Sequence, residues 1–280
     1  MLISLPPTNH HVIIGDSRRM DDLADETIDL AITSPPYWCL KDYGHRGQIG
    51  FQQTYDDYLA SLRAVMAEVL RVLRPGCRFA LNIGDQYLRA AEHGRYRIQP
   101  LPADLTVIGR DLGFDFMGSI IWKKISTTKT SGGGQLMGSI YYPRDGQVTY
   151  EHEFILLFRK QGKSRRPAAE IREKSRLTKE ERLKWFRGVW DDVAPDRQKS
   201  HVAMFPVELP RRLIRMYSFW GETVLDPFLG SGTTSLAAAL EGRNSVGYEI
   251  NPEFERIIRG KIRPSLTGEE FGMEVERRID

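Results

Sequence analysis

Residues 31–40, AITSPPYWCL, place a hydroxyl group, two prolines and an aromatic side chain directly after an apolar stretch. Pro35 and Pro36 stiffen the backbone and remove two amide donors, so neighbouring acceptor groups keep a fixed direction. The Ser34 hydroxyl and the Pro35 carbonyl are such acceptors, and Tyr37 adds a flat ring. The segment is therefore either an ordinary loop end or a place that holds a planar ligand bearing hydrogen-bond donors.

A second stretch, LDPFLGSGTT at 225–234, is typical of a strand, a glycine-bearing turn and a helix start. Gly230 and Gly232 let the backbone approach a ligand closely, although the same pattern fits any tight strand-to-helix turn. The turn has no lysine, and Asp226 would repel phosphate, which disfavours a phosphate-binding loop. Glu249 ends the next apolar run, at a spacing that suits a carboxylate accepting from ribose hydroxyls. These residues predict an adenosine pocket for a ligand without a pyrophosphate group.

Strands that alternate with helices must position these groups. Apolar runs predict strands at 10–14, 28–33, 78–84, 115–124, 151–160, 223–228 and 244–250. Helical spacing, prolines and caps predict helices over 54–73, 102–112, 205–219, 232–241 and from 252 onward. Such alternation predicts an α/β fold with a mainly parallel sheet covered on both faces, and ligands bind beyond the carboxyl ends of its strands. Residues 125–150 lack periodicity and predict a long loop.

The bulk composition is that of a globular protein, with 41% hydrophobic and 28% charged residues among 280. No apolar stretch approaches the ~18 residues of a membrane helix, and the N-terminus does not resemble a signal peptide. Two cysteines, Cys39 and Cys77, form no disulfide framework, which favours a reducing, cytoplasmic setting. The six histidines have no metal-ligand spacing, so we expect no metal.

Taken together, Thr-Ser-Pro-Pro-Tyr-Trp and the downstream Asp-Pro-Phe-x-Gly-Ser-Gly-Thr-Thr resemble the amino-methylating DNA methyltransferases that use S-adenosylmethionine. The order of the two motifs is similar to the beta group of that family, which occurs in restriction-modification systems. The resemblance runs from Gly15-Asp16 to GYEINPEF and is weakest over 125–200. It implies a Rossmann-like, seven-stranded, circularly permuted sheet, one methyltransferase domain over 1–280, and a small target-recognition insert at 125–200.

The resemblance also implies which residues bind the cofactor. Glu249 would hold the ribose hydroxyls, and Asp16 would accept from the adenine amine, a role compatible with capping a helix over 17–23. A helix-leading segment, HVAMFPVELPRRLI, would pack on the methionine moiety. The full set of cofactor-binding residues expected from this resemblance is Asp16, Phe205, Pro206, Asp226, Pro227, Phe228, Gly230, Gly232, Thr233 and Glu249.

The Ser34–Tyr37 segment suits methyl transfer to the exocyclic amine of a nucleobase. Such an amine is a poor nucleophile because its lone pair is conjugated into the ring, and two acceptors that draw its hydrogens away free that lone pair. We expect Ser34, Pro35, Pro36 and Tyr37 to be catalytic, with the tyrosine ring stacking on an extruded base. Trp38 either extends this wall or is a plain core aromatic.

The identity of the target base is less constrained by the motif. Cys39 has no base placed near it by sequence and is expected to be a small buried residue, which argues against covalent catalysis at carbon. In the family, serine at the first motif position goes mostly with the N4 amine of cytosine. The N6 amine of adenine remains the alternative, because a serine acceptor could serve either base.

A basic block over 159–187 carries twelve Lys and Arg against four Asp and Glu. It is either a polyanion contact or a solvated helix surface. Because a base inside a duplex is inaccessible, we expect base flipping and salt-sensitive contacts to double-stranded DNA. The residues expected to contact DNA are Lys123, Lys124, Lys129, Arg165 and Arg166. A cognate restriction endonuclease is a possible partner, and the chain is expected to be a monomer or a homodimer.

Two other functions fit parts of the sequence. An RNA methyltransferase would use the same cofactor, but no RNA-binding module is recognisable. A non-catalytic nucleic-acid-binding protein could keep the fold, but the intact Ser34–Tyr37 segment and Asp226 count against it.

Overall fold

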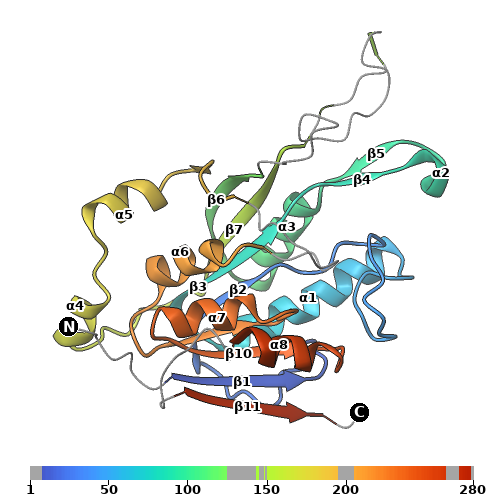
Figure 1. Ribbon diagram of the computed structural model, residues 1–280. Helices are drawn as coiled ribbons and strands as arrows, with labels where there is room; N and C mark the ends of the chain where they lie inside the picture. The colour runs from blue at the N-terminus through green and yellow to red at the C-terminus, as the bar shows by residue number, and fades with distance from the viewer. Residues whose placement is uncertain are drawn as a thin grey trace.

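The computed structural model describes residues 8–124, 143–144, 148, 150–194, 205–262 and 271–278. In these residues nine strands form one mixed sheet in the order β11-β1-β10-β9-β2-β3-β7-β6-β8 (Figure 1). The strands are β1 (Thr8–Ile14), β2 (Ile28–Thr33), β3 (Leu73–Ile83), β6 (Asp115–Lys123), β7 (His152–Arg159), β8 (Val189–Trp190), β9 (Thr223–Asp226), β10 (Asn244–Glu249) and β11 (Phe271–Arg277). A separate two-stranded sheet pairs β4 (Gln86–Leu88) with β5 (Arg97–Gln99).

The seven predicted strands are confirmed, as is the mainly parallel α/β sheet. Only β7 runs antiparallel to its neighbours, between β3 and β6. Neither β8 nor the β4–β5 pair, whose strands have only two or three residues, was predicted from the sequence, and β11 was overlooked, although FGMEVER alternates apolar and polar side chains. β11 pairs in parallel with β1 over its whole length and so extends the edge of the sheet.

Helices cover both faces of the sheet. The larger ones are α1 (Tyr55–Val72), α3 (Leu101–Leu112), α6 (Glu208–Tyr217), α7 (Thr233–Leu240) and α8 (Phe254–Ile262), and the short ones are α2 (Ala90–His93), α4 (Ala169–Lys174) and α5 (Lys179–Trp185). Side chains from alternate positions of β3 separate the two layers. Phe79 and Leu81 pack in the layer of α1 and α3, whereas Ala80 packs in the layer of α6 and α7.

The sheet reverses its winding between β2 and β9. From β9 the chain moves outward through α7 to β10, and from β2 it moves outward through α1 to β3. The two strands are neighbours in parallel register, with Leu30 opposite Val224, although almost 200 residues separate them in sequence. Ligands of open α/β sheets bind at such a switch point, outside the carboxyl ends of the strands.

The segment 125–200 is not a separate insert in its described part. Its strand β7 lies inside the main sheet, and its strand β8 extends the sheet edge beside β6. Arg215 of α6 binds Glu181 of α5 at 2.9 Å, which holds α5 against the body of the fold. Among the described residues, no helix is both long and apolar enough to cross a membrane.

Candidate active site

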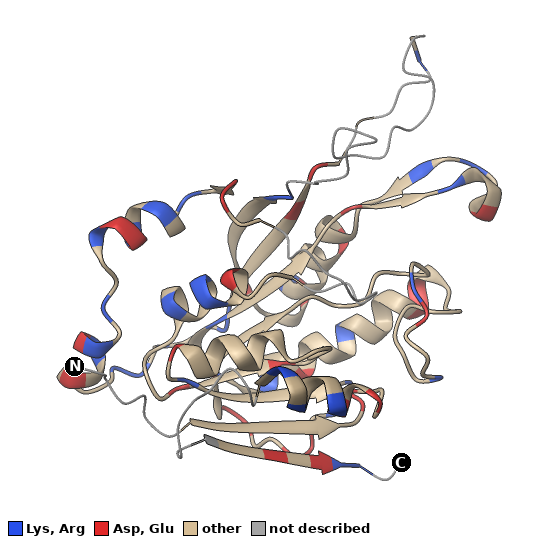
Figure 2. Cartoon of the chain, viewed as in Figure 1, with Lys and Arg blue, Asp and Glu red and all other residues tan. Residues whose placement is uncertain are grey.

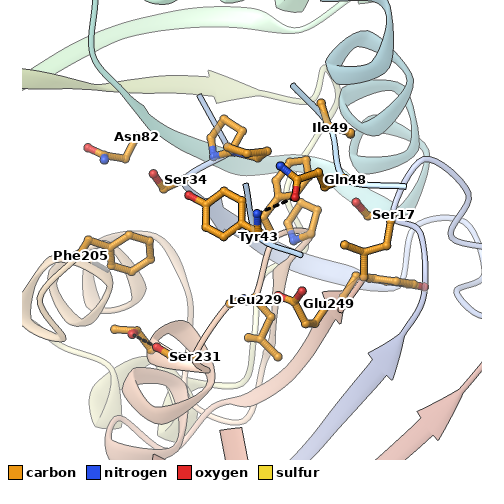
Figure 3. A pocket seen from close by; sticks show the side chains of 18 of the residues that line it. Ser17, Ser34, Tyr43, Gln48, Ile49, Asn82, Phe205, Leu229, Ser231 and Glu249 are labelled. Atoms are coloured by element: carbon orange, nitrogen blue, oxygen red, sulfur yellow. Dashed lines mark hydrogen bonds between the residues drawn. The ribbon is translucent and has the colours of Figure 1, made fainter. Parts of the chain in front are cut away.

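A cavity of about 340 Å³ lies at the carboxyl ends of β1, β2, β9 and β10. Figure 3 shows it from close by, with Ser34 and Asn82 toward one side and Ser17 toward the other. Glu249 and Leu229 lie between these sides, and Tyr43 and Gln48 reach in from the loop that follows β2. The two predicted motifs, which contain Ser34–Tyr37 and Pro227–Thr233, therefore line the same cavity.

Glu249 ends β10 and faces the cavity. Its carboxylate accepts from the backbone amides of Gly230 and Asn251, each at 2.9 Å, and these bonds fix its direction. Burial raises its pKa from 4.5 to about 7, and the two amides and the nearby Asp226 only modify that effect. The remaining lone pairs of this carboxylate are suited to accepting from a pair of hydroxyl groups.

Asp226 holds the switch point together and does not line the cavity. Its carboxylate accepts from the hydroxyl of Thr33 at 2.7 Å, the hydroxyl of Thr234 at 2.5 Å and the amide of Phe228 at 3.0 Å. Burial raises its pKa to about 6, although these three donors oppose the rise. The expectation that Asp226 lines the cofactor pocket is corrected: it lies behind the wall and positions the glycine-bearing turn.

Gly232 is also placed behind the cavity wall. Its φ of +86° lies in the left-handed region, and a Cβ at this position would come within 3.2 Å of Ile258 in α8. Its role is therefore the close approach of the turn to α8. Pro206 is buried and likewise does not line the cavity. The other expected cofactor residues do line it, namely Asp16, Phe205, Pro227, Phe228, Gly230, Thr233 and Glu249.

Asp16 follows β1 and lies at the Ser17 side of the cavity. Its carboxylate accepts from the amide of Arg18 at 2.9 Å and pairs with the Arg18 guanidinium. The predicted helix over 17–23 is wrong, because these residues form turns. The same short acidic side chain that could cap a helix closes a tight turn here.

The Ser34–Tyr37 segment leaves β2 and forms the other end of the cavity. The carbonyl of Pro36 is occupied, since it accepts from the hydroxyl of buried Tyr58 at 2.9 Å. Within the described chain, the Ser34 hydroxyl and the Pro35 carbonyl have no hydrogen-bond partner, and both residues line the cavity. Two acceptors on consecutive residues are thus left without a partner among the described residues.

Tyr37 is held in place by its hydroxyl group. It accepts from the amide of Gly84 at 2.7 Å and donates to Glu153 at 3.1 Å. Burial raises the pKa of this hydroxyl well above its ordinary value, with a further contribution from Glu153, so it stays protonated. The tyrosine therefore presents a neutral ring at the cavity.

The next two residues of the segment point elsewhere. Trp38 is a core residue that donates from its ring to the carbonyl of Gln53 at 2.8 Å and packs on Tyr55. The expectation that Cys39 is buried is wrong, because this side chain is exposed. Desolvation still raises the pKa of its thiol, and it does not line the cavity.

Sequence reasoning missed a polar cluster beside Tyr37. Glu153 of β7 accepts from the Asn82 amide group at 2.7 Å and also binds the ammonium group of Lys124. All three residues line the cavity. Asn82 follows the same rule of polar groups at strand ends, as in LNIGD, but Glu153 carries no local signal. It reaches the cavity only because the antiparallel strand β7 begins where β3 ends.

The four expected DNA-contacting residues that the structure describes do not form one surface. Lys124 lines the cavity and lies over the ring of Trp122 at 5.1 Å, and its neighbour Lys123 ends β6 and is exposed. Ser164, next to Arg165 and Arg166, donates to the carbonyl of Gly76 at the start of β3. That is the opposite end of the strand from Asn82, so the arginine pair lies away from the cavity. Lys129 lies outside the described residues.

This arrangement fits an adenosine-bearing ligand at one end of the cavity and a planar amine-bearing group at the other. Glu249 offers a buried carboxylate at this end, and Phe205, Phe228 and Leu229 supply apolar walls. The matching family model, described as DNA methylase, covers residues 28–260. The chain belongs to this DNA methylase family.

The individual comparisons agree with this assignment. The type II methyltransferase M.MjaI of Methanocaldococcus jannaschii is 37% identical over 97% of each chain. A crystal structure described as a putative DNA modification methylase of Thermus thermophilus, complexed with S-adenosylmethionine, has a TM-score of 0.80 and 36% identity over 97% of this chain and 99% of that one. The PvuII cytosine-N4-specific DNA methyltransferase shares the fold, with a TM-score of 0.65 at 21% identity over 96% of this chain and 98% of that one.

This DNA methylase is an S-adenosylmethionine-dependent enzyme that methylates an amino group of DNA. The residues around Glu249 fit the cofactor, because its adenosine needs an acceptor for hydroxyls and no phosphate-binding lysine. The expected absence of a phosphate loop thus agrees with the chemistry of the ligand.

Proposed function

We propose that this DNA methylase transfers a methyl group to the N4 amine of cytosine in duplex DNA, after the cytosine has been flipped out of the helix. The observation that carries the proposal is the pair of available acceptors, the Ser34 hydroxyl and the Pro35 carbonyl, at the end of the cavity opposite Ser17. Both belong to a segment whose direction is fixed by prolines and by the Tyr58 hydroxyl.

The chain's own residues activate the amine by accepting its two hydrogens. Ser34 accepts one and the Pro35 carbonyl accepts the other, so the nitrogen lone pair loses its conjugation with the ring and becomes nucleophilic. Bound S-adenosylmethionine would supply an electrophilic methyl group, so that the nitrogen–carbon bond forms as the methyl–sulfur bond breaks, and the surplus proton of the amine would pass to water. Holding both reactants in one cavity contributes several kcal/mol, because the encounter becomes intramolecular.

Binding of the flipped base is supported by the walls of the cavity. The neutral ring of Tyr37 offers a stacking face, and its hydroxyl is tied to Gly84 and Glu153 so that the ring does not rotate away. A base that is paired inside a duplex cannot enter such a cavity. Flipping the base out costs a few kcal/mol, which contacts between the protein and the DNA phosphates offset.

Cofactor binding falls to the other end of the cavity. Glu249 would hold the ribose hydroxyls, Asp16 would accept from the adenine amine, and Phe205 and Phe228 would pack against the methionine part. Pro227, Gly230 and Thr233 complete this wall.

Cytosine is favoured over adenine by the serine at the first position of the motif. The N6 amine of adenine is the second candidate, because the same two acceptors would bind it. Duplex DNA methylated by the purified enzyme is digested to nucleosides and analysed by mass spectrometry. We expect N4-methyldeoxycytidine, and N6-methyldeoxyadenosine alone would refute the choice of base.

The role of Ser34 is tested by Ser34→Ala. We expect S-adenosylmethionine affinity to stay the same by calorimetry while turnover falls roughly 10²-fold, a typical loss for one preorganised hydrogen bond. Ser119→Ala, an exposed serine of β6, is the matched control and should keep full turnover. Undiminished turnover of Ser34→Ala would remove the acceptor role.

We further propose that residues 1–280 form a single methyltransferase domain that works beside a restriction endonuclease with the same recognition site. Support comes from the relatives, which include type II methyltransferases of M. jannaschii and Serratia marcescens. Sequencing host DNA at base resolution would give the methylated site. If no restriction endonuclease of the host cleaves that site when it is unmethylated, the proposed partnership with a restriction endonuclease would be contradicted.

A further inference from the structure

The β4–β5 pair forms a ribbon that is separate from the main sheet. Gln86 pairs with Gln99 at its root, and Leu88 pairs with Arg97 toward its tip. The tip contains α2 and ends in Gly94, whose φ is +75°. Figure 1 shows this ribbon projecting beyond the end of β3, away from the layers of the fold. A short two-stranded ribbon is marginal alone, so something must stabilise or use it.

The surface of the ribbon is basic and aromatic. Arg89, Arg95 and Arg97 are exposed, against a single glutamate, Glu92 (Figure 2). Arg89 comes only within 4.0 Å of Glu92 at the tip, and within the described ranges Arg95 and Arg97 form no ion pair. Three cations on a thin ribbon, two of them unneutralised, repel one another unless an anionic partner is present.

Two tyrosines stiffen the ribbon. The rings of Tyr87 and Tyr96 stack at 5.9 Å between centroids and 18° between planes, one from each side of the hairpin. Tyr96 remains 58% exposed, so much of its side chain stays open to solvent. The stacked pair keeps Arg95 and Arg97 at a fixed position on the ribbon.

The ribbon is joined to the catalytic segment at its root, through Gln86, and at its tip, through His93 of α2. The Gln86 side chain donates to the carbonyl of Trp38, and the ring of His93 lies 5.5 Å from the Trp38 ring. Gly84, two residues before β4, donates to the Tyr37 hydroxyl. Any partner held by the ribbon is therefore positioned relative to the cavity that contains Ser34.

We propose that the β4–β5 ribbon docks on duplex DNA beside the flipped base, with Arg95 and Arg97 binding backbone phosphates. The proposal rests on the proposed function, which requires a duplex at the cavity mouth. Two-stranded ribbons fit the major groove of B-DNA, and arginine binds phosphate through paired N–H donors. The predicted pair Arg165 and Arg166 lies at the other end of β3, whereas the ribbon contacts the segment that carries Tyr37, a residue that lines the cavity.

The test is the double substitution Arg95→Ala with Arg97→Ala in the full chain. Binding to duplex DNA that carries the methylation site is measured by fluorescence anisotropy at several salt concentrations. Losing two phosphate contacts makes the negative slope of log K against log salt less steep by about 1.8 and raises Kd by about eightfold for each contact near 0.1 M salt. We expect KM for DNA to rise while kcat at saturating DNA stays near that of the wild type.

The matched control is Arg63→Ala with Arg110→Ala, two exposed arginines on α1 and α3. It removes the same charge and should keep the wild-type salt slope. Arg95→Lys with Arg97→Lys restores the charge on the ribbon and should restore most of the slope. S-adenosylmethionine calorimetry on each variant shows whether the cavity is intact.

The possible outcomes distinguish failure of the ribbon proposal from failure of the proposed function. An unchanged Kd and slope in the alanine variant, with a wild type that binds and methylates DNA, would overturn the ribbon proposal alone. Failure of the lysine variant to restore the slope would also overturn it, as would a loss seen with RNA but not with duplex DNA. A wild type that methylates no DNA amine would instead refute the proposed function.

Discussion

Lowering the pH from 8 to 6 is expected to weaken S-adenosylmethionine binding through Glu249. Burial raises the pKa of this carboxyl to about 7, so the group is about 90% ionised at pH 8 and about 10% ionised at pH 6. The ionised form accepts from ribose hydroxyls best, and its negative charge also favours the cationic sulfonium ligand. If only that form binds, the affinity falls about tenfold, or about 1.4 kcal/mol, as pH falls through 7.

The assay is isothermal titration calorimetry at pH 6, 7 and 8 on the wild type and on Glu249→Gln. The glutamine variant has no carboxyl to titrate, so subtracting its profile removes the titration of the ligand's own amino group. Glu253→Gln, an exposed neighbour, is the control and should keep the wild-type profile. Equal pH profiles for the wild type and Glu249→Gln would refute the assignment of Glu249 as the ribose acceptor.

Two further substitutions test how the cavity is held. Asp226→Ala removes the acceptor shared by Thr33, Thr234 and the Phe228 amide. We expect the free energy of unfolding to fall by about 3 kcal/mol and cofactor binding to weaken. Unchanged stability in urea and unchanged calorimetric affinity would contradict this role. Tyr58→Phe leaves the Pro36 carbonyl unpaired, so we expect about 1 kcal/mol less stability by denaturant unfolding and a lower kcat at unchanged cofactor affinity. A kcat equal to that of the wild type would show that this bond does not position the catalytic segment.

The sequence was sufficient to place the ends of the parallel strands. Ser34, Glu249 and Asp16 each follow an apolar run, and parallel strands bring their carboxyl ends to one edge of a sheet. The resemblance to a known family added the cofactor and the reaction. It misplaced Asp226, because a motif shows which residue occurs and not which way its side chain points.

The missed features depend on contacts between distant segments. Glu153 enters the cavity through the antiparallel placement of β7, which no local pattern indicates. The β4–β5 ribbon has strands of only three residues, too short for alternation to be seen. The basic block suggested Arg165 and Arg166 because charged residues can be counted in a sequence. The sequence does not show at which end of the sheet these residues lie.

The pairing of β2 with β9 makes assembly of the enzyme a late event in its synthesis. Both strands are fully or nearly fully buried, and the Thr33–Asp226 hydrogen bond links them across almost 200 residues. Contacts of such separation form slowly, because a long loop must be closed before they gain energy. A nascent chain therefore carries its catalytic segment on an open, apolar strand edge, prone to aggregation, until β9 emerges from the ribosome. The cavity is complete only when the C-terminal part of the chain adds β9 and β10 to the sheet.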